Sequence, residues 1–262
     1  MDIHFDLGLR AYESGDAYVL ARHRGALGLL PEAGVESQPF LALRWRELWL
    51  DGARMDAIQV AFQAYEAEPA NVDTAIDLSS LLDELKKFPE SLKVLLECAR
   101  LNMEEPDIWH QVGLAADQLD NLELRHQAFK HVWELERVDE PTNRQWIAED
   151  ALIECVEGAI AQLPPMVAGL LGPVLHIFED YPDAWILDTE LGDPRVPVAL
   201  EPLDDAEGEQ LRESRLVFFR WNMERLGDSE EEVSRQIEAA VRDEIAFALG
   251  LDDDVLHFEG EG

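Results

Sequence analysis

"FDLGLRAYESGDAYVLARHRGALGLLP", residues 5–31, reads as two helices joined by a tight turn. Gly15-Asp16 is typical of such a turn, because glycine and aspartate tolerate the backbone conformations that turns require. Pro31 is expected to end the second helix, since proline lacks the N–H that a helix interior needs. Small or apolar residues at regular intervals allow the two helices to pack closely. These residues are Leu7, Gly8, Tyr12, Ala21 and Ala26.

The same arrangement recurs three more times along the chain, in residues 40–69, 75–106 and 107–136. The frame steps by 37, then 34, then 34 residues. The second copy has the turn Asp51-Gly52, the small residues Ala57 and Ala64, and the closing Pro69. The third copy has Leu78, Ser79, Ser91 and Cys98 in the equivalent places, and the fourth has Trp109 and Gly113.

This pattern resembles the tetratricopeptide (TPR) repeat, a helical hairpin of about 34 residues. The third copy departs from the family pattern because it lacks the turn glycine and the closing proline, and the fourth has Arg125 at a usual alanine position. A non-repetitive helical bundle is the alternative. The sequence therefore predicts a TPR-like solenoid of about four hairpins over residues 1–140.

Solenoid repeats present extended surfaces and carry no chemistry of their own, so the resemblance implies protein binding. Arg22, Arg24, Arg44 and Arg46 are the candidate basic residues of a binding face, or otherwise a solvated surface. Trp45 and Trp49 lie four residues apart on one helix face. They are either part of the packing core or an exposed anchor for a partner.

The pattern changes after the junction 138–146, where Pro141, Thr142 and Asn143 interrupt the helical periodicity. Helices are expected over 145–165 and 229–251, extended segments over 173–182, 194–202 and 214–221, and an acidic segment over 201–213. Ser229 and Glu232 form a candidate capping box, and Gly250 a candidate C-cap. The order of elements predicts a small α+β domain over residues 146–262.

This second part resembles the minimal zincin-like (minimal matrix-metalloprotease-like) domain of bacterial proteins. The resemblance covers about residues 146–258 and rests on Leu163-Pro164, on "EDYPD" at 179–183, and on the stretch 217–256. That stretch reads "VFFRWNMERLGDSEEEVSRQIEAAVRDEIAFALGLDDDVL". In the family it would be a strand, a turn with arginine, and a helix bearing His-Glu-x-x-His-x-x-Gly-x-x-Asp.

Most of the family's catalytic residues are missing here. Asp243 stands where the resemblance places the first zinc histidine, and Phe247 where it places the second. The general-base position is retained as Glu244, the turn glycine as Gly250 and the third ligand position as Asp253. Two imidazoles one helical turn apart are what holds the zinc ion, and phenylalanine has no ligating atom.

The resemblance therefore implies a pseudo-peptidase that uses no metal and no cofactor, with Phe247 filling a dry site. Without zinc, Glu244 has no activated water to serve as base. Asp243, Asp253 and their neighbours Asp252 and Asp254 offer oxygen ligands, which suit Ca²⁺, Mg²⁺ or Mn²⁺ better than Zn²⁺. One alternative is therefore divalent-metal binding without catalysis, and another is a divergent metal-dependent peptidase that uses Asp243, Glu244 and Asp253. His257 is a further candidate ligand or simply a solvated side chain.

The charge of the chain limits its partners. Among 262 residues there are 56 Asp and Glu against 21 Lys and Arg, a formal net charge of −35. Such a protein repels nucleic-acid backbones and anionic membranes, so a protein with a basic surface is the expected partner. No small-molecule substrate, no nucleic acid and no membrane are expected. Cys98 and Cys155 suggest reduced thiols, and with no signal-peptide pattern at the N-terminus they favour the cytoplasm.

The sequence as a whole favours a non-catalytic interaction protein, a TPR scaffold joined to a pseudo-metallopeptidase domain. A concrete form is a bacterial cytoplasmic regulator that acts as inhibitor or chaperone of a partner, such as a protease or secreted effector. A peptidase and a self-associating structural protein are the alternatives.

Overall fold

The structure is a computed structural model that describes residues 2–30, 37–138, 146–163, 175–202 and 214–250. The chain divides into two compact units, Met1–Glu136 (unit 1) and Arg137–Gly262 (unit 2). The expected acidic segment 201–213 and the positions Asp253 and His257 lie wholly or largely outside the described residues. Each unit has its own buried apolar cluster.

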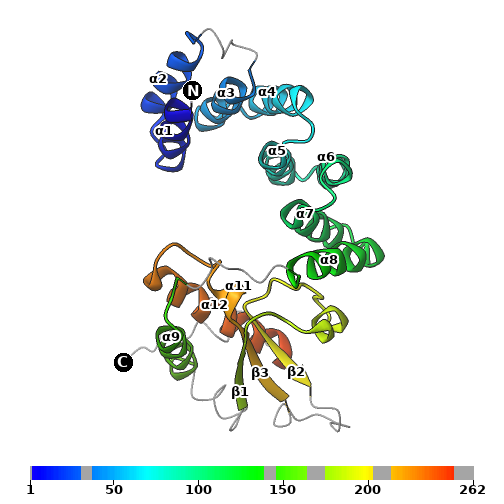
Figure 1. Cartoon of the computed structure of the whole chain (residues 1–262). Coiled ribbons are helices and arrows are strands. Elements are labelled where there is room, and N and C mark those ends of the chain that lie inside the picture. The colour runs from blue at the N-terminus through cyan, green and yellow to red at the C-terminus, as the bar shows by residue number, and fades with distance from the viewer. Residues whose placement is uncertain (1, 31–36, 139–145, 164–174, 203–213, 251–262) are drawn as a thin grey trace. The chain divides into compact units, whose positions relative to one another are not determined.

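Unit 1 is a TPR-like stack of four helical hairpins, drawn from blue to green in Figure 1. The hairpins are α1 (Asp2–Glu13) with α2 (Ala17–Leu27), α3 (Gln38–Leu50) with α4 (Arg54–Ala67), α5 (Val72–Glu84) with α6 (Phe88–Leu101), and α7 (Pro106–Asp117) with α8 (Leu122–Glu136). Each helix packs mainly against its hairpin partner and the next hairpin along the chain. Hairpins of this kind bury their apolar faces only by stacking, which is the construction of a solenoid.

One left-handed residue forms the turn within each hairpin. Gly15 and Gly52 have φ of +70° and +77°, a conformation that glycine adopts without a Cβ penalty. The third and fourth hairpins use Lys86 at +58° and Asp120 at +53° instead. The absence of a turn glycine in the third copy therefore changes the residue but not the turn.

A buried column of side chains runs along the second helices of the hairpins of unit 1. The column Leu27, Ala64, Cys98 and Val132 follows the repeat frame, and all four side chains are fully buried. On α2 the predicted small positions Ala21 and Ala26 are wrong, because both are only partly buried and Leu20 and Leu27 are the buried residues of this helix. In the fourth, Arg125 is accommodated by an ion pair with Asp117 of the same hairpin.

Unit 2 is an α+β unit with a three-stranded sheet. Its strands β1 (Leu175–Glu179), β2 (Val198–Pro202) and β3 (Ser214–Phe219) are arranged in the order β1-β3-β2. β1 pairs parallel with β3, and β2 pairs antiparallel with it. Val217, Phe218 and Phe219 on the central strand are fully buried, as expected for a strand with neighbours on both sides.

Helices pack on the sheet of unit 2. They are α9 (Glu149–Ala161), the 3-10 helix η1 (Ala184–Asp188), the single turn α11 (Arg220–Met223) and α12 (Glu230–Leu249). Along α12, Val233, Ile237, Val241 and Ile245 recur every four residues and are buried, which gives one apolar face toward α9 and β2. Ser229 caps the helix through Glu232 N, and Gly250 ends it in the left-handed conformation, both as expected.

Candidate functional site

A cavity of about 310 Å³ opens between the first helices of three successive hairpins, α1, α3 and α5. Phe5, Ala42 and Ile76 occupy equivalent places in the repeat frame, one on each helix. The complete lining is Phe5, Leu9, Gln38, Ala42, Arg46, Asn71, Asp73, Thr74, Ile76 and Asp77. We call this cavity the groove cavity.

Polar ties between α3 and α5 hold the groove cavity in shape. The Nη2 of Arg46 lies 2.5 Å from Oδ2 of Asp77, and Gln38 Nε2 donates to Thr74 Oγ1 at 2.7 Å. Arg46 is 9 % exposed and its Nη1 also donates to the carbonyl oxygen of Ala42. Burial raises the pKa of Asp77, with Arg46 opposing the shift and Asp73 adding to it.

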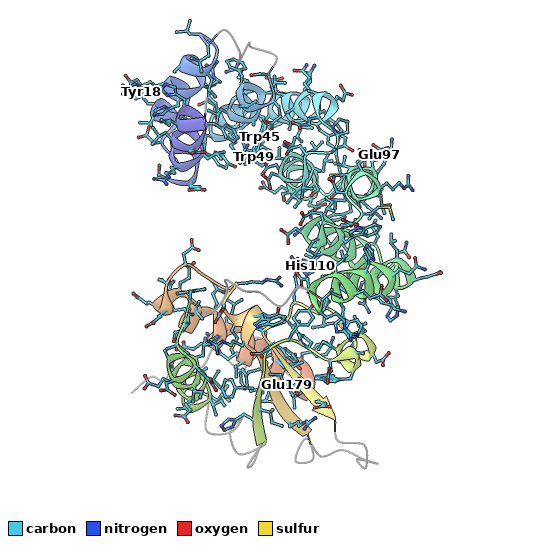
Figure 2. The ribbon with its side chains drawn as sticks, in the orientation of Figure 1. Tyr18, Trp45, Trp49, Glu97, His110 and Glu179 are labelled. Carbon is cyan, nitrogen blue, oxygen red and sulfur yellow. The ribbon has the colours of Figure 1, made fainter. Side chains whose placement is uncertain are left out.

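Trp45 and Trp49 belong to the core of unit 1. They are 3 % and 7 % exposed, so the interpretation as an exposed anchor is wrong and the packing interpretation is right. Trp45 contacts Tyr12 edge-on and carries the Arg46 guanidinium 4.1 Å above its ring. Figure 2 shows both tryptophans on α3, whereas Tyr18 on α2 points away from the stack. Because both rings are buried, neither offers a free face to a partner.

The arginines predicted as a basic binding face serve different purposes. Arg24 and Arg44 both pair with Glu47, at 2.7 and 2.8 Å, and the first of these pairs ties α2 to α3. Arg46 is paired inside the stack with Asp77. Arg22 is exposed on α2. Three of the four arginines are therefore already ion-paired within unit 1, with Arg24 and Arg44 sharing one carboxylate.

In unit 2 the positions Asp243, Glu244 and Phe247, which the sequence comparison with zincins singled out, lie on the last two turns of α12. Asp243 is exposed, Glu244 is partly buried, and Phe247 is 49 % exposed. Glu244 Oε1 accepts a hydrogen bond from the backbone N–H of Leu200 at 2.7 Å. Burial raises the pKa of Glu244, and the bond from Leu200 opposes this. Gly250 ends the helix, and Asp253 lies outside the described residues.

A second cavity of about 240 Å³ lies beside Phe247. Its walls are mainly apolar and come from η1, the segment before β2, β2 itself and α12. They are Ile186, Thr189, Glu190, Leu191, Val196, Ala199, Leu200, Glu244, Phe247 and Ala248. The expectation that Phe247 fills this site is wrong, because its half-exposed ring lines an open cavity instead.

Groups of three or more His, Cys, Asp or Glu suited to one metal ion do not occur among the described residues. Within the same part of the chain, no helix is long and apolar enough to cross a membrane. Cys98 and Cys155 are free thiols.

Two features escaped the sequence prediction. His4 and His23, on α1 and α2, bring their Nδ1 atoms within 3.1 Å, and nothing in their spacing indicates this contact. The groove cavity did have a signal, because Phe5, Ala42, Ile76 and His110 are separated by the steps of the repeat frame. Reading that column as an inward-facing surface would have located three of the cavity's walls.

No known protein-family profile matches the sequence. No curated protein matches it either. Among solved structures, one of the MamA protein is similar with a TM-score of 0.41 and 16 % identity, over 52 % of this chain and 73 % of that one. A second MamA structure has a TM-score of 0.42 and 13 % identity, and the match covers 52 % of this chain and 78 % of that one. The structure of MamA 41-end from Desulfovibrio magneticus RS-1 has a TM-score of 0.41 and 16 % sequence identity, and the match covers 53 % of this chain and 76 % of that one. A likeness this weak adds nothing to what the hairpins themselves show.

Proposed function

We propose that this chain is a non-catalytic scaffold that binds another protein through α1, α3 and α5, the first helices of three hairpins in unit 1. The observation that carries the proposal is the groove cavity, which is open to solvent between α1, α3 and α5. Adjacent hairpins of a solenoid together form extended surfaces, and such surfaces suit peptide and protein ligands. With a net charge of −35, the chain favours a partner with a basic surface, because complementary charge speeds the encounter.

Unit 2 is proposed to be a pseudo-metallopeptidase that supplies a second docking surface beside Phe247. Two features of α12 support a non-catalytic role. Phe247 replaces a ligand position with a hydrocarbon ring, and Glu244 is occupied with the amide of Leu200. That hydrogen bond engages one of the two carboxylate oxygens of Glu244 in a contact within the fold. The apolar cavity next to it still suits an apolar side chain of a partner.

The finer proposal is a cytoplasmic regulator that keeps one client protein, such as a protease or a secreted effector, inactive or export-competent. The free thiols Cys98 and Cys155 are in keeping with a reducing compartment. A regulator of this kind requires only surfaces and a stoichiometric complex, and both units provide surfaces.

The test is purification of the tagged full-length protein from its native cells, followed by reconstitution with the co-purifying protein. We expect a complex of fixed stoichiometry by light scattering and a change in the partner's activity. The same preparations should be assayed for bound zinc and for hydrolysis of unfolded casein, with Glu244→Gln as control. Casein hydrolysis that disappears in Glu244→Gln would identify a peptidase and overturn the scaffold proposal. A protein that forms no hetero-complex would overturn it as well.

A further inference from the structure

We propose that the groove cavity binds a lysine or arginine side chain from a basic segment of the partner protein. This inference rests on the scaffold function proposed above and names the chemistry of its binding site. It depends on three properties of the cavity, which are the apolar walls, the sign of the charge inside it, and its rigidity.

The walls suit the hydrocarbon stem of a basic side chain. Phe5 and Leu9 on α1 and Ile76 on α5 are partly buried, and Ala42 on α3 is 3 % exposed between them. Long basic side chains bury their methylene groups on apolar surface while the charged head reaches a polar group. A cavity of about 310 Å³ has room for such a stem.

The charged groups inside the cavity favour a cation. Its ionisable groups are two carboxylates, Asp73 and Asp77, and one guanidinium, Arg46. Arg46 is already committed to Asp77, to the carbonyl of Ala42 and to the ring of Trp45. Burial raises the pKa of Asp77 even with this partner, so its carboxylate is poorly solvated and a second cation nearby would stabilise its charge.

An anionic ligand fits the same place poorly, although the first turns of α3 and α5 contribute to the lining. The first turn of α5 carries Asp73, and the side chain of Asn71 already accepts a hydrogen bond from Thr74 N. The first turn of α3 contains Pro39, which has no N–H to donate. An acidic segment would therefore face two carboxylates with few free donors.

The cavity is also preorganised. The Gln38–Thr74 and Arg46–Asp77 contacts fix α3 against α5, so binding a side chain requires little reordering of the walls. Preorganisation lowers the entropic cost of association. The charge that remains to be paired is that of Asp73, which is exposed at the edge of the cavity.

The test uses fluorescence anisotropy with the full chain and short labelled peptides in which leucine alternates with lysine, glutamine or glutamate. Salt is kept at about 150 mM to screen contacts outside the cavity. The variants are Asp73→Asn, the matched control Glu66→Gln on the exposed surface of α4, and Ala42→Met, which fills the cavity. Thermal melting confirms that each variant is folded.

We expect the lysine peptide alone to bind. Asp73→Asn should weaken it about two- to fivefold, the range for one exposed charge pair, while Glu66→Gln leaves it unchanged. Ala42→Met should weaken it about tenfold or more if it folds, since the space for the stem is lost. If Asp73→Asn and Glu66→Gln weaken binding equally, the peptide is responding to net charge alone and the inference is overturned.

The same variants separate this inference from the scaffold proposal. A native partner that binds wild type, Asp73→Asn and Ala42→Met with equal affinity would overturn the groove-cavity site and leave the scaffold function standing. A full chain that forms no complex with any native protein, yet binds the lysine peptide as described, would overturn the scaffold function instead.

Discussion

The backbone N–H of Leu200 donates a hydrogen bond to Oε1 of Glu244 at 2.7 Å, between residues 44 apart in the chain. Leu200 lies on β2, which among the described strands pairs with β3. Phe219 N donates to Pro197 O, so the alternation of antiparallel bonds turns the amide of Leu200 away from β3. Glu244 thus accepts a hydrogen bond from an amide that β3 does not pair, which gives this glutamate a structural role.

Glu244→Ala is predicted to destabilise unit 2 by about 1–3 kcal/mol, because the Leu200 amide loses its acceptor in a partly buried place. Glu244→Gln keeps a carbonyl oxygen and should cost much less. Amide hydrogen exchange at Leu200 measures the effect directly, and it should be faster in the alanine variant than in the glutamine variant. If the Leu200 amide exchanged at the same rate in wild type and Glu244→Ala, the hydrogen bond to Glu244 would not stabilise β2.

The same residue predicts a pH dependence. Burial raises the pKa of Glu244 above its ordinary value of 4.5, so the folded protein binds this proton more tightly than the unfolded chain does. Stability therefore falls as pH rises through the folded pKa and is gained as pH falls toward 4.5. In denaturant unfolding, the free energy of unfolding of the wild type should rise relative to that of Glu244→Gln as the pH is lowered from 7 to 5. If the difference in free energy of unfolding between wild type and Glu244→Gln did not change with pH, the pKa of Glu244 would not be raised in the folded protein.

Gly113 is predicted to be essential to the fourth hairpin. A Cβ at this position would lie 2.2 Å from Cε1 of Phe129, so Gly113→Ala forces the ring or the helix to move and should cost about 1–3 kcal/mol. Gly25→Ala, on α2 with nothing within 4 Å of the new Cβ, is the matched control and should stabilise by up to about 1 kcal/mol. Thermal melts compare the two. Gly113→Ala with Phe129→Leu should recover part of the loss.

The hairpins of unit 1 were predictable because their signals are local. Turns at Gly15 and Gly52 and the buried column that contains Ala64 and Cys98 repeat at fixed spacing, and each hairpin packs mainly on its neighbours. The first hairpin shows the limit, because the spacing of alanines there selected Ala21 and Ala26 rather than Leu20 and Leu27. A single copy contains too few small residues to fix the phase of the packing face.

The site residues were less predictable, because contacts across the chain determine their role. Sequence gives Arg24 as a free basic residue, but Glu47 comes within its reach only after α2 and α3 pack, whereas Arg44 pairs with Glu47 one turn along the same helix. Likewise Glu244 follows its motif position, while its bond to Leu200 depends on where α12 crosses β2. The sequence gives the charge of a residue and its position in a motif. Contacts between residues on different elements, such as these two, are known only once the chain is folded.

Asn222 is predicted to fix the segment before β2. It is 1 % exposed, and its Nδ2 donates to the carbonyl oxygens of Pro194 and Val196, both at 2.8 Å. Asn222→Asp removes both donors and places a carboxylate against two carbonyls, so it should cost about 3 kcal/mol or more. Asn222→Leu should cost less than the aspartate variant, since it buries no charge. Denaturant unfolding measures the stability of both variants, and an Asn222→Asp variant more stable than Asn222→Leu would contradict the prediction.

Arg46 and Asp77 are predicted to stabilise unit 1 as a pair. Their side chains are 11 % and 30 % exposed, so part of the attraction is screened by solvent. Arg46→Met leaves the poorly solvated carboxylate of Asp77 without its cation and should cost about 2–3 kcal/mol, whereas Arg46→Met with Asp77→Leu should recover about 1 kcal/mol or more of that loss. A double-mutant cycle by denaturant unfolding measures the coupling. If the two losses simply add, the ion pair does not hold α3 to α5, and the Gln38–Thr74 hydrogen bond and apolar packing set the shape of the groove cavity.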